Sequence, residues 1–512
     1  VAKEAGFIIE DGELQFAHLK PHQVVMIKWA LRKGRGLIAA SFGLGKTRVQ
    51  IEMLRLLHQR TGQKMLVICP LGVRQQFTLE DGPVMGIDFR YVGCDEDVAA
   101  SDGPYLITNY ERVRDGQISA ATIREHIGGV CMDEASILGN LGTKTLEQFR
   151  LIFADTPYRW AATATPAPND YRQIIYYADF FDVMDAGQAL TRWFGRNPDK
   201  AGDLRLHPHM EREFWLWVSS WALFVNKPSD LGYSDEGYVV PELEIVWHRL
   251  TSDHQRAWDL TDNNGQHYLL KDTAAGVQQA TREKRDSMDI RIAEALRIIE
   301  ADDPDAHWVV WHHLEDERRA MNKVLPDAKD VYGSQDLEER EQRIVDFSRG
   351  KYRILATKPQ LAGSGTNFQW FCNRAIYSGL DFKFKDFIQS VHRLQRYGQT
   401  KPVVLHMIHT DAEDHVVRIL MQKWQKHNEL IQRMRAIVHE YGLTNEALVS
   451  GLQRTLGVHR QEWRGDHSHL VNNDTVEESF HLPDDSLDLI VTSIPFGNHY
   501  EYVAKLNDFG HN

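Results

Sequence analysis

The sequence predicts an α/β protein of two lobes in tandem, each built on a parallel sheet that helices flank. Short apolar runs alternate with amphipathic stretches from Gly36 onward, and a second series of such runs begins near residue 301. The chain has 512 residues, whereas a single hydrophobic core stops growing near roughly 250 to 300 residues. Two large domains are therefore the starting expectation.

The first series supplies the strands expected in the first lobe. In chain order these runs are GLIAAS, MLVICP, YLITNY, GVCMDEA and RWAATATP, and the helix-like RVQIEMLRLLHQ follows the first of them. Residues 171–240 are rich in aromatic side chains, and we expect them to form helices packed on this lobe. The segment NKPSDLGYSDEGYVVPE interrupts the periodic patterns and predicts the boundary between the lobes. Lobe 1, with its helical insertion, is accordingly expected over residues 1–235.

The second lobe is expected over residues 236–440. Its apolar runs are HWVVWHH, DAKDVYG, YRILATK and NRAIYSG, and residues 281–300 form a helical pattern that leads into them. Residues 412–440 predict a long amphipathic helix whose basic residues are Arg418, Lys423, Lys426, Arg433 and Arg435. A solvated face and a contact with nucleic acid explain this helix equally well. We interpret residues 441–512 as a linker and the start of a further, partial α/β segment.

Composition narrows the class of protein. Hydrophobic residues make up 42% of the chain and charged residues 26%, as in ordinary globular proteins. The formal net charge of −13 argues against a basic coat, so a nucleic-acid site has to be a local groove. The four cysteines have no metal-binding or disulfide-framework spacing, which fits a reducing cytoplasm. No apolar run approaches the roughly 18 residues of a membrane span, so we expect no membrane partner.

The strongest local motif is SFGLGKT at residues 41–47, between an apolar strand and a helical segment. This context is typical of a phosphate-binding loop, in which backbone N–H groups at a helix N-terminus face the phosphates. Gly43 and Gly45 permit the turn, Lys46 offers a positive charge to the β- and γ-phosphates, and Thr47 can ligate Mg²⁺. We therefore predict a nucleotide site at residues 43–47, Leu44 included.

A second motif, DEAS, follows the short strand GVCM and places Asp133 at the carboxyl end of that strand. Asp133 is predicted to hold Mg²⁺, and Glu134 to polarise the attacking water. An acidic pair after a strand is common by itself. Its combination with the upstream GKT sequence favours ATP and Mg²⁺ as cofactors.

The order of these motifs resembles that of superfamily 2 helicases, and most closely the SWI/SNF-type branch of duplex DNA translocases, over roughly residues 15–430. The resemblance implies two RecA-like P-loop lobes that share one nucleotide site. LKPHQ is similar to the branch's LRPYQ segment, which implies that Gln23 contacts the adenine edge. The GLGKT form, with Ala40 in place of the first glycine, is also typical of that branch.

Further motifs extend the resemblance along both lobes. LVICPLGVRQQF, with Pro70, and TATP, with Thr163 and Thr165, resemble segments that contact DNA or couple it to ATP; LITNYE is similar to the family's ITTYE. In lobe 2, AGSGTNFQ resembles a loop that contacts DNA and nucleotide, which implies roles for Gly365 and Asn367. QSVHRLQRYGQ resembles the family's Q-x-x-x-R-x-x-R-x-GQ motif, a pattern that implies arginine fingers at Arg393 and Arg396 and a nucleotide-site role for Gln399.

The resemblance implies an ATP-dependent translocase that steps along duplex DNA as the two lobes close and open. Two alternatives stay open. One is a helicase that separates DNA or RNA strands. The other is a weakly catalytic DNA-binding scaffold for a methyltransferase, which Ser136 and Ala164 keep open because they replace a histidine and a glycine of the family pattern.

The C-terminal segment NNDTVEESFHLPDDSLDLIVTSIPFGNHYEY resembles the opening of an amino-directed DNA methyltransferase. The corresponding tetrad consists of Ser493, Ile494, Pro495 and Phe496. In such enzymes the tetrad holds the exocyclic amine of a flipped base. We expect this segment to be the front of a larger domain rather than a vestigial tail or an ordinary strand and turn. S-adenosylmethionine is expected as a cofactor only if a complete domain follows. A methyltransferase or restriction partner in a bacterial or phage-infected cell is then expected.

Overall fold

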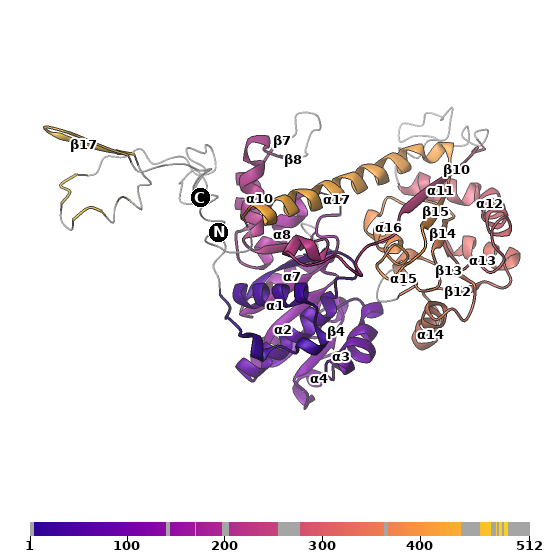
Figure 1. Cartoon of the computed structure of the whole chain (residues 1–512), viewed down its shortest axis with the longest axis horizontal. Coiled ribbons are helices and arrows are strands. Elements are labelled where there is room, and N and C mark those ends of the chain that lie inside the picture. Colours follow the sequence, from indigo (N-terminus) through magenta and orange to yellow (C-terminus); the bar gives the residue numbers. More distant parts are fainter. Residues whose placement is uncertain are drawn as a thin grey trace.

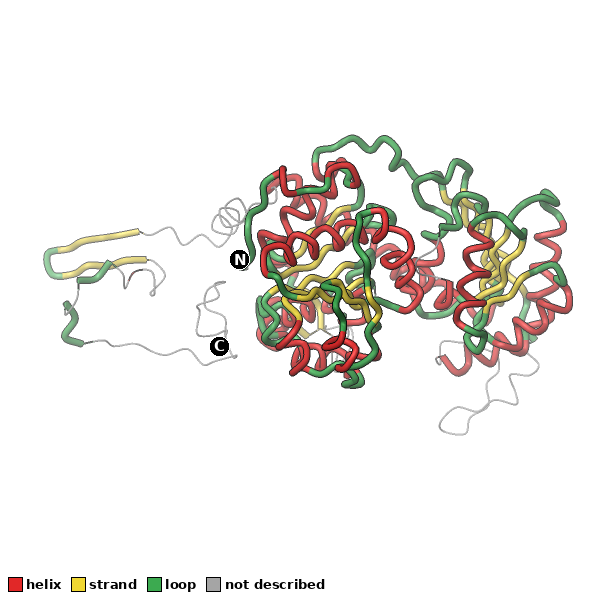
Figure 2. The backbone as a smooth tube through the Cα atoms, turned by 90° about the horizontal axis from the view of Figure 1, so that it is seen from below, coloured by secondary structure: helices red, strands yellow, loops and turns green. Residues whose placement is uncertain are grey.

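The computed structural model describes residues 5–139, 144–168, 170–196, 204–253, 277–362, 367–441, 461–472, 478, 481–483 and 486–489. Figure 1 shows two α/β bodies side by side, with the long helix α17 (Asp414–Tyr441) crossing from one to the other. We call them lobe 1 and lobe 2. Each contains one parallel sheet between helices, as Figure 2 shows, so the predicted fold class is confirmed.

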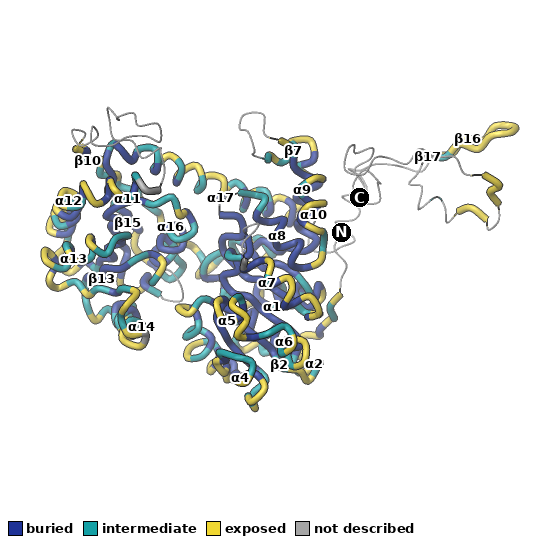
Figure 3. The backbone as a smooth tube through the Cα atoms, turned by 180° about the vertical axis from the view of Figure 1, so that it is seen from behind, coloured by how far each residue is buried: buried dark blue, intermediate teal, exposed yellow. Residues whose placement is uncertain are grey.

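Lobe 1 is built on a seven-stranded sheet in the order β3-β4-β2-β5-β6-β1-β9. Its strands are β1 (Arg35–Ala40), β2 (Lys64–Ile68), β3 (Arg90–Tyr91), β4 (Tyr105–Thr108), β5 (Ile127–Asp133), β6 (Tyr158–Ala162) and β9 (Ala222–Val225). The helices around it are α1 (Pro21–Lys33), α2 (Lys46–Thr61), α3 (Asp81–Val84), α4 (Asp95–Ala100), α5 (Tyr110–Arg114), α6 (Ala120–His126) and α7 (Lys144–Ile152). Helices on both faces bury the central strands completely, which explains their continuous apolar runs (Figure 3).

The aromatic-rich insertion of lobe 1 is only partly helical. It contains α8 (Arg172–Phe180), α9 (Ala186–Trp193), the hairpin β7 (Phe194–Arg196)–β8 (Leu204–Leu206) and α10 (Glu211–Ser219). The run ALFV that follows α10 is strand β9, which pairs in parallel with β1. The expectation of helices throughout residues 171–240 is therefore wrong at the β7–β8 hairpin and at β9. A short continuous apolar run does not distinguish a buried strand from a buried helix.

Lobe 2 contains a six-stranded parallel sheet in the order β10-β15-β14-β11-β13-β12. Its strands are β10 (Leu243–Leu250), β11 (Trp308–Trp311), β12 (Lys329–Val331), β13 (Ile354–Thr357), β14 (Arg374–Tyr377) and β15 (Val403–Thr410). The helices are α11 (Val277–Asp286), α12 (Met288–Glu300), α13 (Glu315–Val324), α14 (Leu337–Ser348), α15 (Pro359–Ala362) and α16 (Phe384–Val391). The four predicted runs correspond to β11 to β14, whereas β10 and β15 were not predicted.

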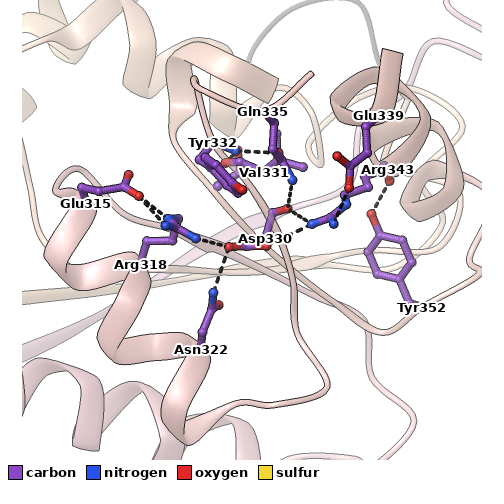
Figure 4. A network of polar contacts seen from close by, with 11 residues as sticks. Glu315, Arg318, Asn322, Asp330, Val331, Tyr332, Gln335, Glu339, Arg343 and Tyr352 are labelled. Atoms are coloured by element: carbon purple, nitrogen blue, oxygen red, sulfur yellow. Dashed lines mark hydrogen bonds and ion pairs between the residues drawn. The ribbon is translucent and has the colours of Figure 1, made fainter. Parts of the chain in front are cut away.

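Polar contacts hold the edge strand β12 in place. Asp330 accepts hydrogen bonds from Arg318 and Asn322 of α13 and from Arg343 of α14 (Figure 4). Arg318 is also paired with Glu315, one helical turn earlier. These contacts bind the two helices to the end of the sheet, where only one neighbouring strand is available.

Helix α17 belongs to both lobes. Its first half packs on lobe 2 through Val416 and Leu420, whereas Leu430, Met434 and Ile437 lie in the hydrophobic core of lobe 1. Three of its basic residues hold it to the lobes. Lys423 donates to the Phe382 carbonyl, Arg433 pairs with Glu211, and Arg435 pairs with Asp230. These three side chains therefore have intramolecular partners, while the solvated face and the nucleic-acid contact both stay open as predictions.

The described C-terminal residues form the antiparallel hairpin β16 (Gln461–Gly465)–β17 (Ser468–Asn472), which Figure 1 shows apart from both lobes. The methyltransferase-like tetrad at 493–496 lies outside the described residues. Within the described ranges, no helix combines the length and apolar character needed to cross a lipid bilayer.

Candidate active site

The predicted phosphate-binding loop lies between β1 and α2, and two of its glycines have left-handed backbone conformations. Gly43 has φ 81° and Gly45 has φ 76°, a region that residues with a side chain rarely adopt. A Cβ atom at Gly45 would lie 2.0 Å from Gln23 Nε2, and one at Gly43 would lie 2.0 Å from the Tyr397 ring. Conformation and close approach therefore both require glycine here.

Gln23 holds the loop in place from helix α1. Its Nε2 donates to the Leu44 carbonyl at 3.1 Å, and its Oε1 accepts from the Lys20 N–H at 2.8 Å. His22 Nε2 lies 3.2 Å from the same Leu44 oxygen. The predicted adenine contact of Gln23 stays a prediction, and in this arrangement its amide fixes the loop.

Lys46 begins helix α2 at the predicted position. Its ammonium donates to the carbonyls of Ala40 at 2.9 Å and Ser41 at 3.3 Å. Burial lowers the pKa of Lys46, while the carboxylates of Glu134 and Asp133 oppose that shift. Thr47 is buried at the next position of the helix. The charge of Lys46 is thus held inside the loop, where a phosphate group would pair with it.

Asp133 lies at the carboxyl end of β5, as predicted. Its Oδ1 accepts from Gln50 Nε2 at 2.8 Å, and its backbone carbonyl accepts from the Tyr110 hydroxyl at 2.7 Å. Burial, followed by the neighbouring Glu134 charge, raises the pKa of Asp133 to about 6, and Lys46 opposes the rise. The contacts of Asp133 with Gln50 and Lys46 do not offset its burial and the neighbouring charge of Glu134. A bound cation would stabilise its ionised form.

Glu134 links the two lobes. It adopts a left-handed backbone conformation with φ 51°, which is uncommon for a residue with a side chain. Its Oε2 accepts a hydrogen bond of 2.9 Å from Gln389 Nε2 of α16. The carboxylate predicted to activate water is therefore held from the opposite lobe.

Arg393 and Arg396 follow α16 and face the loop from lobe 2. Burial, followed by the charge of Arg396, lowers the pKa of Arg393 to about 9, and Glu134 opposes the shift. The Nε of Arg396 is buried without a hydrogen-bond partner among the described residues. Both arginines are thus placed in an environment that favours an anion.

A cavity of about 50 Å³ brings the predicted residues together. Its lining comes from both lobes and consists of Phe42, Gly43, Gly45, Lys46, Thr47, Val73, Gln76, Asp133, Glu134, Arg393 and Arg396. Three cations thus face two carboxylates. Pockets that hold drug-sized ligands are typically about 300 to 1,000 Å³, so a nucleoside triphosphate requires the cleft to widen.

The residues fit a triphosphate with a divalent cation. Lys46, Arg393 and Arg396 match the phosphates in charge, while Thr47 and Asp133 offer the oxygen ligands that Mg²⁺ prefers. No group of three or more His, Cys, Asp or Glu side chains among the described residues could hold a metal by itself.

The other predicted residues are placed differently. Pro70 lines a second cavity between the lobes, of about 210 Å³, together with residues of α14 and α15. Thr163 and Thr165 are fully buried, and the Thr163 hydroxyl accepts from the Thr165 N–H at 3.1 Å. Gln399 Nε2 donates to the Cys372 carbonyl at 2.9 Å, so its amide holds a turn in lobe 2. Asn367 is half-buried, whereas Gly365 lies outside the described residues.

Sequence reasoning missed several residues of the site. Gln50 holds Asp133, Gln389 holds Glu134, and Phe42 stacks on His392 across the lobes. Gln389 could have been predicted from the sequence, because it is the first residue of the motif that contains both arginines. No local sequence pattern marks Gln50 or the Phe42–His392 stack, since the partners in each contact are remote in the sequence.

Two parallel-sheet lobes that share a cavity lined by the predicted phosphate-binding loop are the arrangement expected of a two-lobed P-loop protein. Residues 22–200 match the family described as SNF2-related domain. The matched residues lie in lobe 1.

Among solved structures, the chain is similar to the Sulfolobus solfataricus SWI2/SNF2 ATPase core in complex with double-stranded DNA. The two share 17% sequence identity, the alignment covers 88% of this chain and 98% of that one, and the TM-score is 0.38. No curated protein matches the chain.

Proposed function

We propose that the chain hydrolyses ATP and uses the cycle to move along duplex DNA. The observation that carries this proposal is the single cavity to which lobe 1 contributes Lys46 and the carboxylates, and lobe 2 the two arginines. A site completed by two bodies is catalytic only when they close on each other. ATP binding and hydrolysis are thereby coupled to relative motion of the lobes.

Each residue has a role in this proposal. Lys46 pairs with the phosphates, and Asp133 and Thr47 hold Mg²⁺, which when bound neutralises charge on the phosphate oxygens. Glu134 accepts the proton of the attacking water. Arg393 and Arg396 stabilise the charge that develops on the transferred group, an effect worth roughly 10³ to 10⁵ in rate for arginine fingers.

DNA as the partner is supported by the SNF2-related match and by the order of motifs in both lobes. The cavity of about 210 Å³ beside Pro70 also lies between the lobes, where relative motion is transmitted to a bound strand. We propose residues 1–235 and 236–440 as the two motor lobes, with α17 shared between them. The methyltransferase-like sequence at 493–496 supports a role in a bacterial or phage DNA modification system, in the cytoplasm.

The deciding experiment measures ATP hydrolysis by the purified chain without nucleic acid and with duplex DNA, single-stranded DNA or RNA. Duplex DNA is expected to stimulate a rate that Lys46→Ala and Arg396→Ala abolish. Arg319→Ala is the matched control, because this arginine is exposed on α13. Displacement of a third strand from a triplex, without separation of the duplex, distinguishes translocation from unwinding. Absence of stimulated hydrolysis by the wild type would favour the scaffold alternative.

A further inference from the structure

An aromatic contact joins the lobes beside the candidate active site. The ring of Phe42, within the phosphate-binding loop, stacks on the His392 ring with centroids 4.4 Å apart and an interplanar angle of 22°. Phe42 immediately precedes Gly43, and His392 immediately precedes Arg393. The contact therefore connects the predicted phosphate-binding loop to the segment that carries the arginines.

The Phe42 ring is also tied to the charged centre of lobe 1. The Lys46 ammonium lies 5.6 Å from the ring centroid, within the range of a cation–π contact. Phe42 itself lines the cavity together with Lys46 and both arginines. One ring thus has contacts with a phosphate-binding cation on its own lobe and with the arginine segment of the other.

The His392 ring is held in one orientation. Its Nδ1 lies 3.0 Å from the Gln395 carbonyl oxygen, and Gln395 Nε2 donates to the Pro241 carbonyl in the connection between the lobes at 3.2 Å. Burial lowers the pKa of His392 to about 4, and the charges of Arg396 and Arg393 contribute. The ring is neutral at physiological pH, so it stacks on Phe42 without adding a further positive charge to the site.

We propose that Phe42 and His392 are positioning residues for the hydrolysis reaction, which set how Arg393 and Arg396 enter the site when the lobes close. The inference rests on the proposed function. Neither ring supplies a proton or a charge to the reaction. Their stack restricts the relative orientation of the two segments, because aromatic pairs prefer offset-stacked or edge-to-face arrangements.

The test compares Phe42→Ala, His392→Ala and the double variant in DNA-stimulated ATP hydrolysis. Stacked pairs contribute about 0.5 to 1.5 kcal/mol beyond burial, so we expect kcat to fall roughly 2- to 10-fold. KM for ATP is expected to stay within about twofold, because the phosphate-binding residues are retained. The double variant is expected to match the single ones, since either change removes the same contact.

Two conservative designs separate positioning from general packing. The exchange Phe42→His with His392→Phe keeps two stacked rings and is expected to restore kcat to within about twofold of the wild type. Phe16→Ala, which truncates an exposed ring of lobe 1, is the matched control and is expected to leave kcat unchanged. Thermal unfolding of each variant shows whether it is folded. If the alanine variants are unfolded, the kcat of the exchange variant tests the positioning role by itself.

The outcomes are distinct for the two proposals. A wild type without DNA-stimulated hydrolysis removes the proposed function and this inference with it. If the wild type is active but Phe42→Ala keeps its full kcat, or if the exchange variant is as slow as the double alanine variant, only the positioning role is overturned. Additive losses in the double variant would likewise show that the rings act separately.

Discussion

At the scale of single residues, the candidate site concentrates charge that the protein neutralises incompletely. The Asp133 side chain accepts a hydrogen bond from Gln50, is buried, and lies next to the charge of Glu134. Its raised pKa means that the ionised carboxylate is less stable in the folded chain than in water. Such an arrangement is costly for the fold and suited to a site that binds a cation.

The sign of this effect leads to a prediction for Asp133→Asn. The folded chain binds the Asp133 proton more tightly than the unfolded chain, so this group makes the free energy of unfolding fall as pH rises from about 4 to about 6. The variant is therefore expected to be more stable than the wild type at pH 7.5, by about 1 to 3 kcal/mol, and to lose ATP hydrolysis. Urea unfolding at pH 4.5 and 7.5 measures the difference, which is expected to be smaller at pH 4.5.

The exposed Asp88 offers a control of the same chemistry. Its side chain is 80% exposed, and Asp88→Asn is expected to change stability by less than about 0.5 kcal/mol at either pH. If Asp133→Asn were no more stable than the wild type at pH 7.5, the buried carboxylate would not be the source of strain.

The charged residues of the site were predictable, because each belongs to a short motif next to a predicted strand or helix. Lys46, Asp133, Glu134, Arg393 and Arg396 all line the same cavity. Their neutral partners were not predictable. Phe42 and His392 stack on each other from different lobes although they are far apart in the sequence. Such a contact leaves no local sequence pattern in either segment.

At the scale of elements, α17 is the helix whose role differs most from its sequence pattern. The predicted range, 412–440, agrees closely with the observed Asp414–Tyr441. Amphipathic periodicity located the helix but could not say that its apolar face changes partner halfway along. The missed strands β10 and β15 have a similar explanation, since strands at and next to a sheet edge carry mixed polar and apolar residues.

A matched pair of methionines tests the packing of α17. Met434 is fully buried in the lobe 1 core, whereas Met421, on the same helix, is 37% exposed. Met434→Ala is expected to lower the free energy of unfolding by about 2 to 5 kcal/mol, because it removes buried methylene groups and leaves a cavity. Met421→Ala is expected to cost less than about 1 kcal/mol. Urea denaturation followed by tryptophan fluorescence measures both.

Equal losses for the two methionines would contradict the placement of the second half of α17 in lobe 1. The outcome also bears on the basic residues of this helix. If the second half is anchored as described, Arg433 and Arg435 are paired with Glu211 and Asp230 of lobe 1.

At the scale of the whole molecule, the two lobes are in direct contact around a cavity too small for a nucleotide. Pairs that cross the cleft include Gln389 with Glu134, Phe42 with His392, and Gln75 with Glu341. Nucleotide entry has to separate at least some of them. Under the proposed function, the arrangement is one state of a cycle in which the lobes move.

Cross-linking tests this requirement. Gln75→Cys with Glu341→Cys, in a Cys94→Ser background that removes the half-exposed native thiol, places two cysteines on facing lobes. A short bismaleimide is expected to hold the cleft shut and to slow the uptake of a fluorescent ATP analogue at least roughly tenfold. Each single-cysteine variant, treated identically, is expected to bind at the wild-type rate. Unchanged uptake by the cross-linked protein would mean that nucleotide enters without separation of the lobes.

The dual membership of α17 also has a consequence during synthesis. The sheet of lobe 1 is complete at Val225, but its core contains Leu430, Met434 and Ile437. A ribosome that adds roughly 5 to 20 residues per second needs about ten to forty seconds for the intervening stretch. Throughout that interval the nascent first lobe exposes an apolar patch to solvent, which makes it a natural client for chaperones.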